Sequence, residues 1–84
     1  MKRKHFVVIS DCAVDNMGYD EVNVVAVVHS LKKAKSILQK TAAEEKQYAL
    51  EHGWEIHSDT DSDFDAGEEG YYAAEHAHFY IAEV

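Results

Sequence analysis

The chain has 84 residues, of which 46% are hydrophobic and 29% are charged, and its formal net charge is -8. This length predicts one domain over residues 1–84 with little volume for a deep catalytic cavity, because so small a chain buries only about 60% of its unfolded surface. The longest uninterrupted apolar run, Val24–Val28, is far shorter than the roughly 20 residues that span a bilayer, so a membrane-spanning helix is excluded.

The first third of the chain predicts two strands joined by a turn. Segment 4–14 is rich in β-branched residues, and turn-forming Asp, Asn and Gly follow it. Segment 21–29 has the same apolar character, so we expect a long-looped antiparallel hairpin. The single cysteine, Cys12, lies in the first strand and is interpreted as a small buried hydrophobe. A lone cysteine excludes an internal disulfide and is typical of a cytoplasmic protein.

A long helix is predicted after this hairpin. Ser30 stands at the N-cap position, helix-favouring residues fill 31–52, and Gly53 ends the helix because glycine enters the left-handed region without strain. The face expected to pack on the sheet is mainly apolar and follows spacings of three and four: Leu31, Ala34, Leu38, Ala42, Glu45 and Ala49, flanked by Ile37 and Tyr48.

Two or three further strands are expected to close the chain. Trp54–His57 is a short strand candidate, an acidic loop over 57–70 follows it, and segment 74–84 alternates between apolar and polar residues with a period of two. The predicted fold class is therefore α+β, an antiparallel sheet of four to five strands with one long helix packed on one face, in the chain order ββαββ(β).

The first two strands are apolar on both faces. In the first strand Phe6 and Val8 alternate with Val7 and Ile9. In the second, strict alternation sets one group of residues against another: Val22, Val24, Ala26 and Val28 against Val25 and Val27. Because one helix covers only one face of a sheet, the other face needs cover from the C-terminal strands, from a second copy of the chain or from a partner protein.

Charge is distributed unevenly along the chain. All eight Lys and Arg residues lie at or before Lys46, whereas ten acidic residues and no basic ones lie from Gln47 onward. Such a field repels a phosphate backbone and attracts a basic protein surface. We therefore expect no direct binding of nucleic acid, no membrane contact and a basic protein partner, such as a nucleic-acid-binding protein.

The acidic loop does not match an EF-hand, although aspartates fall at every second position from Asp59 to Asp65. With Asp59 as position 1, position 6 is Phe64 and position 12 is Gly70, where the motif needs Gly and Glu. Weak binding of a divalent cation stays open. The carboxylates are interpreted as solvated, since general acid–base chemistry needs a desolvating cleft.

Histidine supplies the one weak candidate for a metal site. His76 and His78 alternate on one face of the last strand, about 7 Å apart, a spacing at which two imidazoles can converge on one ion. A third ligand would have to come from His57, His5 or an aspartate of the acidic loop. Two histidines on an exposed strand face beside Tyr80 are the simpler interpretation, so no cofactor and no metal are predicted.

The layout "HFVVISD…VNVVAVVHSLKKAKSIL…HGWEIHSD…GYYAAEHAHFYIAEV" is a hairpin, a Ser-capped helix and a closing, acid-rich hairpin. In architecture and charge it resembles the small acidic orphan proteins of phages, prophages and gut bacteria, including some anti-CRISPR and other anti-defence proteins. The resemblance implies a non-enzymatic inhibitor that occupies a basic nucleic-acid site on its target, and it carries over no functional residue.

The function predicted from the sequence is a non-enzymatic protein-binding module, with an acidic surface that mimics nucleic acid. Its expected binding residues are acidic and aromatic: Asp59, Asp61, Asp63, Asp65, Glu68, Glu69, Trp54, Tyr71 and Tyr72. Two alternatives stay open: an accessory protein that self-associates as a homodimer through its Val-rich sheet face, and a metal-binding module that uses His76, His78 and the acidic loop.

Overall fold

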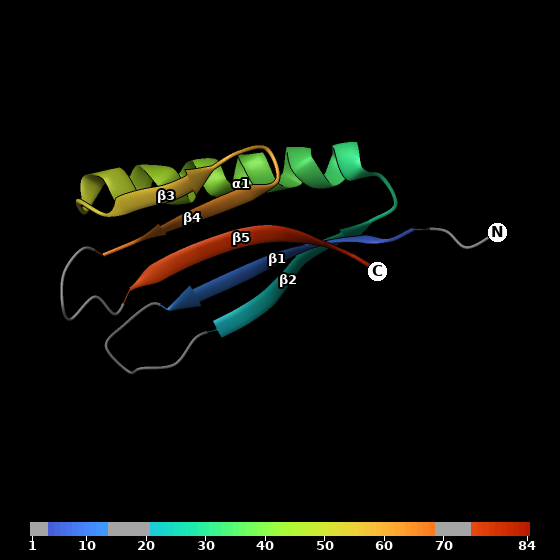
Figure 1. The fold of residues 1–84 in the computed structure, drawn as a ribbon, viewed down its shortest axis with the longest axis horizontal. Helices are drawn as coiled ribbons and strands as arrows, with labels where there is room; N and C mark the ends of the chain where they lie inside the picture. Colours follow the sequence, from blue (N-terminus) through green and yellow to red (C-terminus); the bar gives the residue numbers. More distant parts are fainter. Residues whose placement is uncertain (1–3, 14–20, 69–74) are drawn as a thin grey trace.

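The computed structural model of the protein describes residues 4–13, 21–68 and 75–84 and confirms the predicted α+β class. One helix packs on a single antiparallel sheet of five strands (Figure 1). The elements in chain order are β1 (Phe6–Ala13), β2 (Glu21–Val28), α1 (Leu31–Glu51), β3 (Glu55–Asp59), β4 (Asp63–Gly67) and β5 (His76–Glu83). Within this described part, no helix is long and apolar enough to cross a membrane.

The strands lie in the order β2-β1-β5-β4-β3, and every neighbouring pair is antiparallel. The two ends of the chain therefore supply the central strands, while β2 and β3 form the edges. Helix α1 connects these two edges and packs across one face of the sheet, in contact with all five strands (Figure 1). The two hairpins that the chain forms thus end up at opposite edges of one sheet.

The helix has the limits that its terminal residues predict. The Ser30 hydroxyl accepts a hydrogen bond from the Lys33 amide at 3.4 Å, which satisfies one of the free N–H groups of the first turn. Gly53 follows the C-cap with φ at +70°, in the left-handed region that favours glycine. The Trp54 amide then donates to the Ala49 carbonyl at 2.8 Å and leads the chain back to the sheet.

The core between helix and sheet is thin. Its buried residues include Ala34, Leu38, Ala42 and Ala49 from α1 and Val8, Phe64, Ala66, Ala77 and Phe79 from the sheet. Five of these nine are alanines, so the helix approaches the strands closely, and the larger side chains fill the remaining space. Glu45 is the polar member of the predicted helix face; it is half-buried, and partial desolvation raises the pKa of its carboxyl group.

The segment expected to be an acidic loop is instead a tight hairpin. Strands β3 and β4 pair across a turn at 60–62, in which the Thr60 hydroxyl accepts from the Asp63 amide at 3.0 Å. Phe64 and Ala66 of β4 are fully buried against the helix. The density of aspartates concealed a strand because its two apolar residues alternate with acids that face the other way.

A β-bulge corrects the predicted alternation of β2. Val8 pairs with Ala26 and Ile9 with Val24, so Val25 is the extra residue. The bulge shifts the phase of the strand. Val22 and Val24 consequently share the face of the sheet opposite α1 with Val27, whereas simple alternation had placed Val27 on the other face.

Candidate protein-binding surface

Strand β2 carries the largest group of exposed apolar side chains among the described residues. The exposed fractions are 61% for Val22, 61% for Val24, 40% for Val25 and 57% for Val27. A large exposed apolar patch on a small protein marks a binding site more often than chance. We call these four residues, with Val7 and Ile9 beside them on β1, the valine surface.

The register of the sheet places the valine surface on the face that α1 does not cover. Val7 pairs with Val27 and Ile9 with Val24, so these side chains point in the same direction. The opposite face of β1 carries Val8, which is fully buried under the helix. The sheet face remote from the helix is therefore apolar over β2 and over β1 as far as Ile9.

The two edges of the sheet differ in a way that bears on association. Edge strand β3 has five residues, three of which are Glu55, His57 and Asp59. Edge strand β2 has eight residues, and its single charged residue is Glu21 at the start. Natural sheets protect their edges with short strands, charges and prolines. By these criteria β3 is protected, whereas β2 is long and carries a charge only at its start; a β-bulge at Val25 is its other protective feature.

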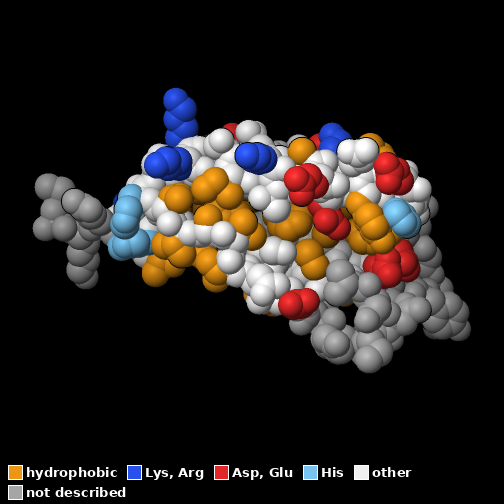
Figure 2. Space-filling model, turned by 180° about the vertical axis from the view of Figure 1, so that it is seen from behind, with side chains coloured by type: hydrophobic (Ala, Val, Ile, Leu, Met, Phe, Trp, Pro, Cys, Tyr) orange, Lys and Arg blue, Asp and Glu red, His pale blue; other side chains and the backbone are white. Residues whose placement is uncertain are grey.

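Charges and apolar side chains also separate on the surface. Figure 2 views the molecule from the side of α1, and hydrophobic side chains extend from the centre of this face to its lower rim, the side on which β2 lies in Figure 1. Acidic side chains gather toward the end of this face that lies away from the N-terminus (Figure 2). Strand order places the valine surface, on β2 and β1, at the opposite side of the sheet from the acidic β3–β4 hairpin.

The predicted acidic surface is largely paired within the chain. Lys46 Nζ lies 2.6 Å from Asp59 Oδ2, and Lys35 Nζ lies 3.3 Å from Asp61 Oδ2. Both aspartates come from the β3–β4 hairpin and both lysines from α1, so these ion pairs fasten the hairpin to the helix. The aspartate side chains remain 42% and 51% exposed, respectively. Both carboxylates face lysines of their own helix, and these lysines partly neutralise the negative charge that a basic partner would bind.

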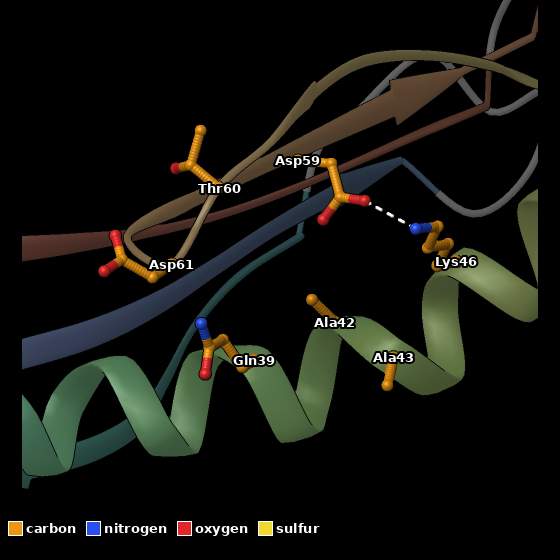
Figure 3. A pocket seen from close by; sticks show the side chains of 7 residues that line it. All are labelled: Gln39, Ala42, Ala43, Lys46, Asp59, Thr60 and Asp61. Carbon is orange, nitrogen blue, oxygen red and sulfur yellow. Dashed lines mark hydrogen bonds and ion pairs between the residues drawn. The ribbon is translucent and has the colours of Figure 1, made fainter.

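A shallow groove of about 330 Å³ lies between helix and hairpin at this point. In Figure 3 the Asp59 side chain points across the groove toward Lys46, and Ala42 of α1 points toward the hairpin from below. The residues around it are Gln39, Ala42, Ala43, Lys46, Asp59, Thr60 and Asp61. The charged groups of Lys46 and Asp59 bind each other across the groove and are not free for a ligand. We therefore interpret the groove as the place where the hairpin is attached to the helix.

The other two aspartates of the hairpin point away from α1. Asp63 and Asp65 lie on β4, and Asp63 Oδ1 is 2.7 Å from His78 Nε2 on β5. Partial burial by itself raises the pKa of Asp63, but hydrogen bonds from His78 and Ser58, with the charge of His78, outweigh it and hold the pKa below the ordinary value. The even spacing of four aspartates therefore corresponds to two separate surfaces, one on each side of the sheet.

The remaining predicted binding residues are only partly within the described chain. Trp54 is half-buried and packs edge-on against Tyr48, with ring centroids 5.3 Å apart. With Glu68 and Glu75 it borders a hollow of about 300 Å³. Three predicted residues, Glu69, Tyr71 and Tyr72, lie outside the described residues.

His76 and His78 share one strand face with Tyr80, as the alternation predicts, and the rings of His78 and Tyr80 lie 4.8 Å apart. Over the described ranges, no three His, Cys, Asp or Glu side chains lie close enough together to hold a metal ion. Burial raises the pKa of the Cys12 thiol, and the charges of Glu45 and Asp11 add to this against hydrogen bonds from Ser10 and the His78 backbone, so the reactive thiolate form is disfavoured.

Asp11 is a notable polar residue of the first strand that sequence reasoning did not single out. It lies in β1 between Val22 and His78 on the uncovered face, and its Oδ1 is buried without a hydrogen-bond partner in the described structure. A polar residue inside a strand of valines was the available signal. Sequence reasoning also left open which edge of the sheet would be exposed, since that depends on strand order.

Comparison with protein-family models, with curated proteins and with solved structures finds no match.

Proposed function

We propose that the protein is a non-enzymatic protein-binding module whose binding site is the valine surface. The observation that carries this proposal is the exposure of four valines on one edge strand, at 40% to 61%. Burying apolar surface is the main driving force of protein association, at roughly 25 cal/mol per Å². A free strand edge adds backbone hydrogen bonds to a partner strand.

The proposed binding surface is not the acidic surface that the sequence predicted as a mimic of nucleic acid. A mimic needs carboxylates presented in the positions of phosphates, and Asp59 and Asp61 are held by Lys46 and Lys35 of the same chain. No described residue of the chain covers the valine surface in this way. It is therefore the surface with the most free energy to gain from a partner.

Replacing Val24 and Val27 with lysine tests the proposal. The double variant V24K/V27K should fold, because both side chains are more than half exposed. It should lose what the tagged wild-type chain captures, whether an untagged copy of the chain or another protein from a bacterial lysate. Leu50→Lys is the matched control, since Leu50 is 62% exposed on α1, away from the sheet. Equal capture by all three chains would contradict the proposal.

A further inference from the structure

We infer that the partner of the valine surface is a second copy of this chain, joined by antiparallel pairing of β2 with β2 into a continuous ten-stranded sheet. This inference rests on the proposed function and names its partner. Four features support a second copy: the matching faces of the strand, the placement of charge along the sheet, a complementary pair of charges at the strand ends, and the protection of the other edge.

Strand β2 is complementary to itself when it is turned around. A two-fold axis between Val24 and Val25 sets Val22 opposite Val27 and Asn23 opposite Ala26 of the second copy. In the structure, Val22, Val24 and Val27 share the face remote from α1, while Glu21, Asn23, Ala26 and Val28 share the other face. Three of the four pairs across the axis therefore lie on matching faces: Val22–Val27, Asn23–Ala26 and Glu21–Val28. The bulge at Val25 produces this match, because an unbulged strand of eight residues would place opposite faces together.

The placement of charge allows two copies to meet at this edge. The chain has a net charge of -8, so a random encounter between two copies is repulsive. Strand order puts the acidic β3–β4 hairpin at the far edge of the sheet from β2. Pairing through β2 thus places the two acidic hairpins at the outer ends of the joined sheet, where their repulsion is weakest.

The ends of β2 carry opposite charges that the same pairing brings together. Glu21 is exposed at the start of the strand, and an exposed Lys33 lies beside its end, where a hollow of about 340 Å³ is bordered by Val27, Val28, His29, Ser30 and Lys33. Pairing about the two-fold axis sets Glu21 opposite Val28 of the second copy, on the helix side and so next to this hollow. Lys33 makes no ion pair with another described residue. By symmetry, the dimer contains this Glu21–Lys33 contact twice.

Sedimentation of the purified full chain over a range of concentrations tests the dimer. Wild type and Leu50→Lys should show the same monomer–dimer equilibrium, while V24K/V27K should sediment as a monomer with an unchanged circular dichroism spectrum. A wild type that stays monomeric at every concentration would overturn the inference. A V24K/V27K variant that dimerises as tightly as Leu50→Lys would also overturn it.

Charge reversal tests the pairing register. Glu21→Lys and Lys33→Glu should each weaken the dimer about tenfold, because each puts like charges at two symmetric contacts. The double variant E21K/K33E should recover most of the loss. Additive weakening in the double variant would overturn the β2–β2 register. If the wild type is monomeric but captures other proteins that V24K/V27K does not capture, the dimer is refuted and the proposed function stands. If the wild type is monomeric and captures no more protein than V24K/V27K does, the proposed function is refuted as well.

Discussion

The charge of Asp63, on the sheet face that α1 does not cover, stabilises the fold through a contact with His78. Its carboxylate binds His78, 2.7 Å away on the neighbouring strand, and this contact with the hydrogen bond from Ser58 holds its pKa below the ordinary value. A carboxyl group with a pKa lowered by folding stabilises the folded state at pH values above its unfolded pKa. That contribution is lost as the pH falls through the folded pKa.

Asp63→Asn should therefore lower the free energy of unfolding by about 0.5 to 1 kcal/mol at neutral pH, as expected for a half-exposed charged hydrogen bond. The difference from wild type should shrink as the pH falls below about 3.9, the ordinary value for an unfolded aspartate. Denaturant unfolding at several pH values measures it. In a His78→Ala background the same substitution should cost much less, and an equal cost in both backgrounds would show that the pair is not coupled.

At the scale of elements, the β3–β4 hairpin is attached to α1 by ion pairs at its tip and by Phe64 beneath. The Lys46–Asp59 pair is partly exposed, so its coupling energy should be about 0.2 to 1 kcal/mol and should decrease in high salt. A double-mutant cycle with Lys46→Met and Asp59→Asn measures this coupling. Lys40→Met is the control, because Lys40 makes no ion pair within the described ranges. A coupling that is insensitive to salt would contradict the assignment.

The elements that the sequence predicts correctly are those whose signals are local. Ser30 and Gly53 mark the helix limits through their own backbone preferences, and the alternation around Phe79 marks β5. Strand β4 was missed because its apolar residues, Phe64 and Ala66, are outnumbered by aspartates. The bulge at Val25 leaves no local signal, since any residue of the valine run can be the extra one.

The candidate site was harder to predict than the fold because it depends on which strands become edges. The sequence predicts an apolar second face over the first two strands, and that much the structure confirms. It does not predict that β5 inserts between β1 and β4, which leaves β2 at the margin. The pairing of Asp59 and Asp61 with lysines of α1 is likewise a long-range contact that residue spacing does not encode.

For the molecule as a whole, a thin core means that the free energy of unfolding is small. A domain of this length has a free energy of unfolding of about 4 to 13 kcal/mol. Phe64→Ala removes the largest fully buried side chain and should cost about 3 to 5 kcal/mol. We expect this variant to be largely unfolded or to melt far below wild type in a thermal scan. Leu50→Ala, at an exposed site, should change stability by less than about 0.5 kcal/mol, and similar melting temperatures for both variants would refute this account of the core.

The difference between the two sheet edges sets a limit on growth. A subunit with two open edges would add copies without end and form a fibre, because each new copy would present another free strand. In this chain the outer strand is short and carries Glu55, His57 and Asp59, so further strand addition is opposed by like charge and by the few backbone groups on offer. In the proposed dimer, pairing through β2 would cover the one unprotected strand edge that the described residues of each copy present, so the assembly would end at two copies.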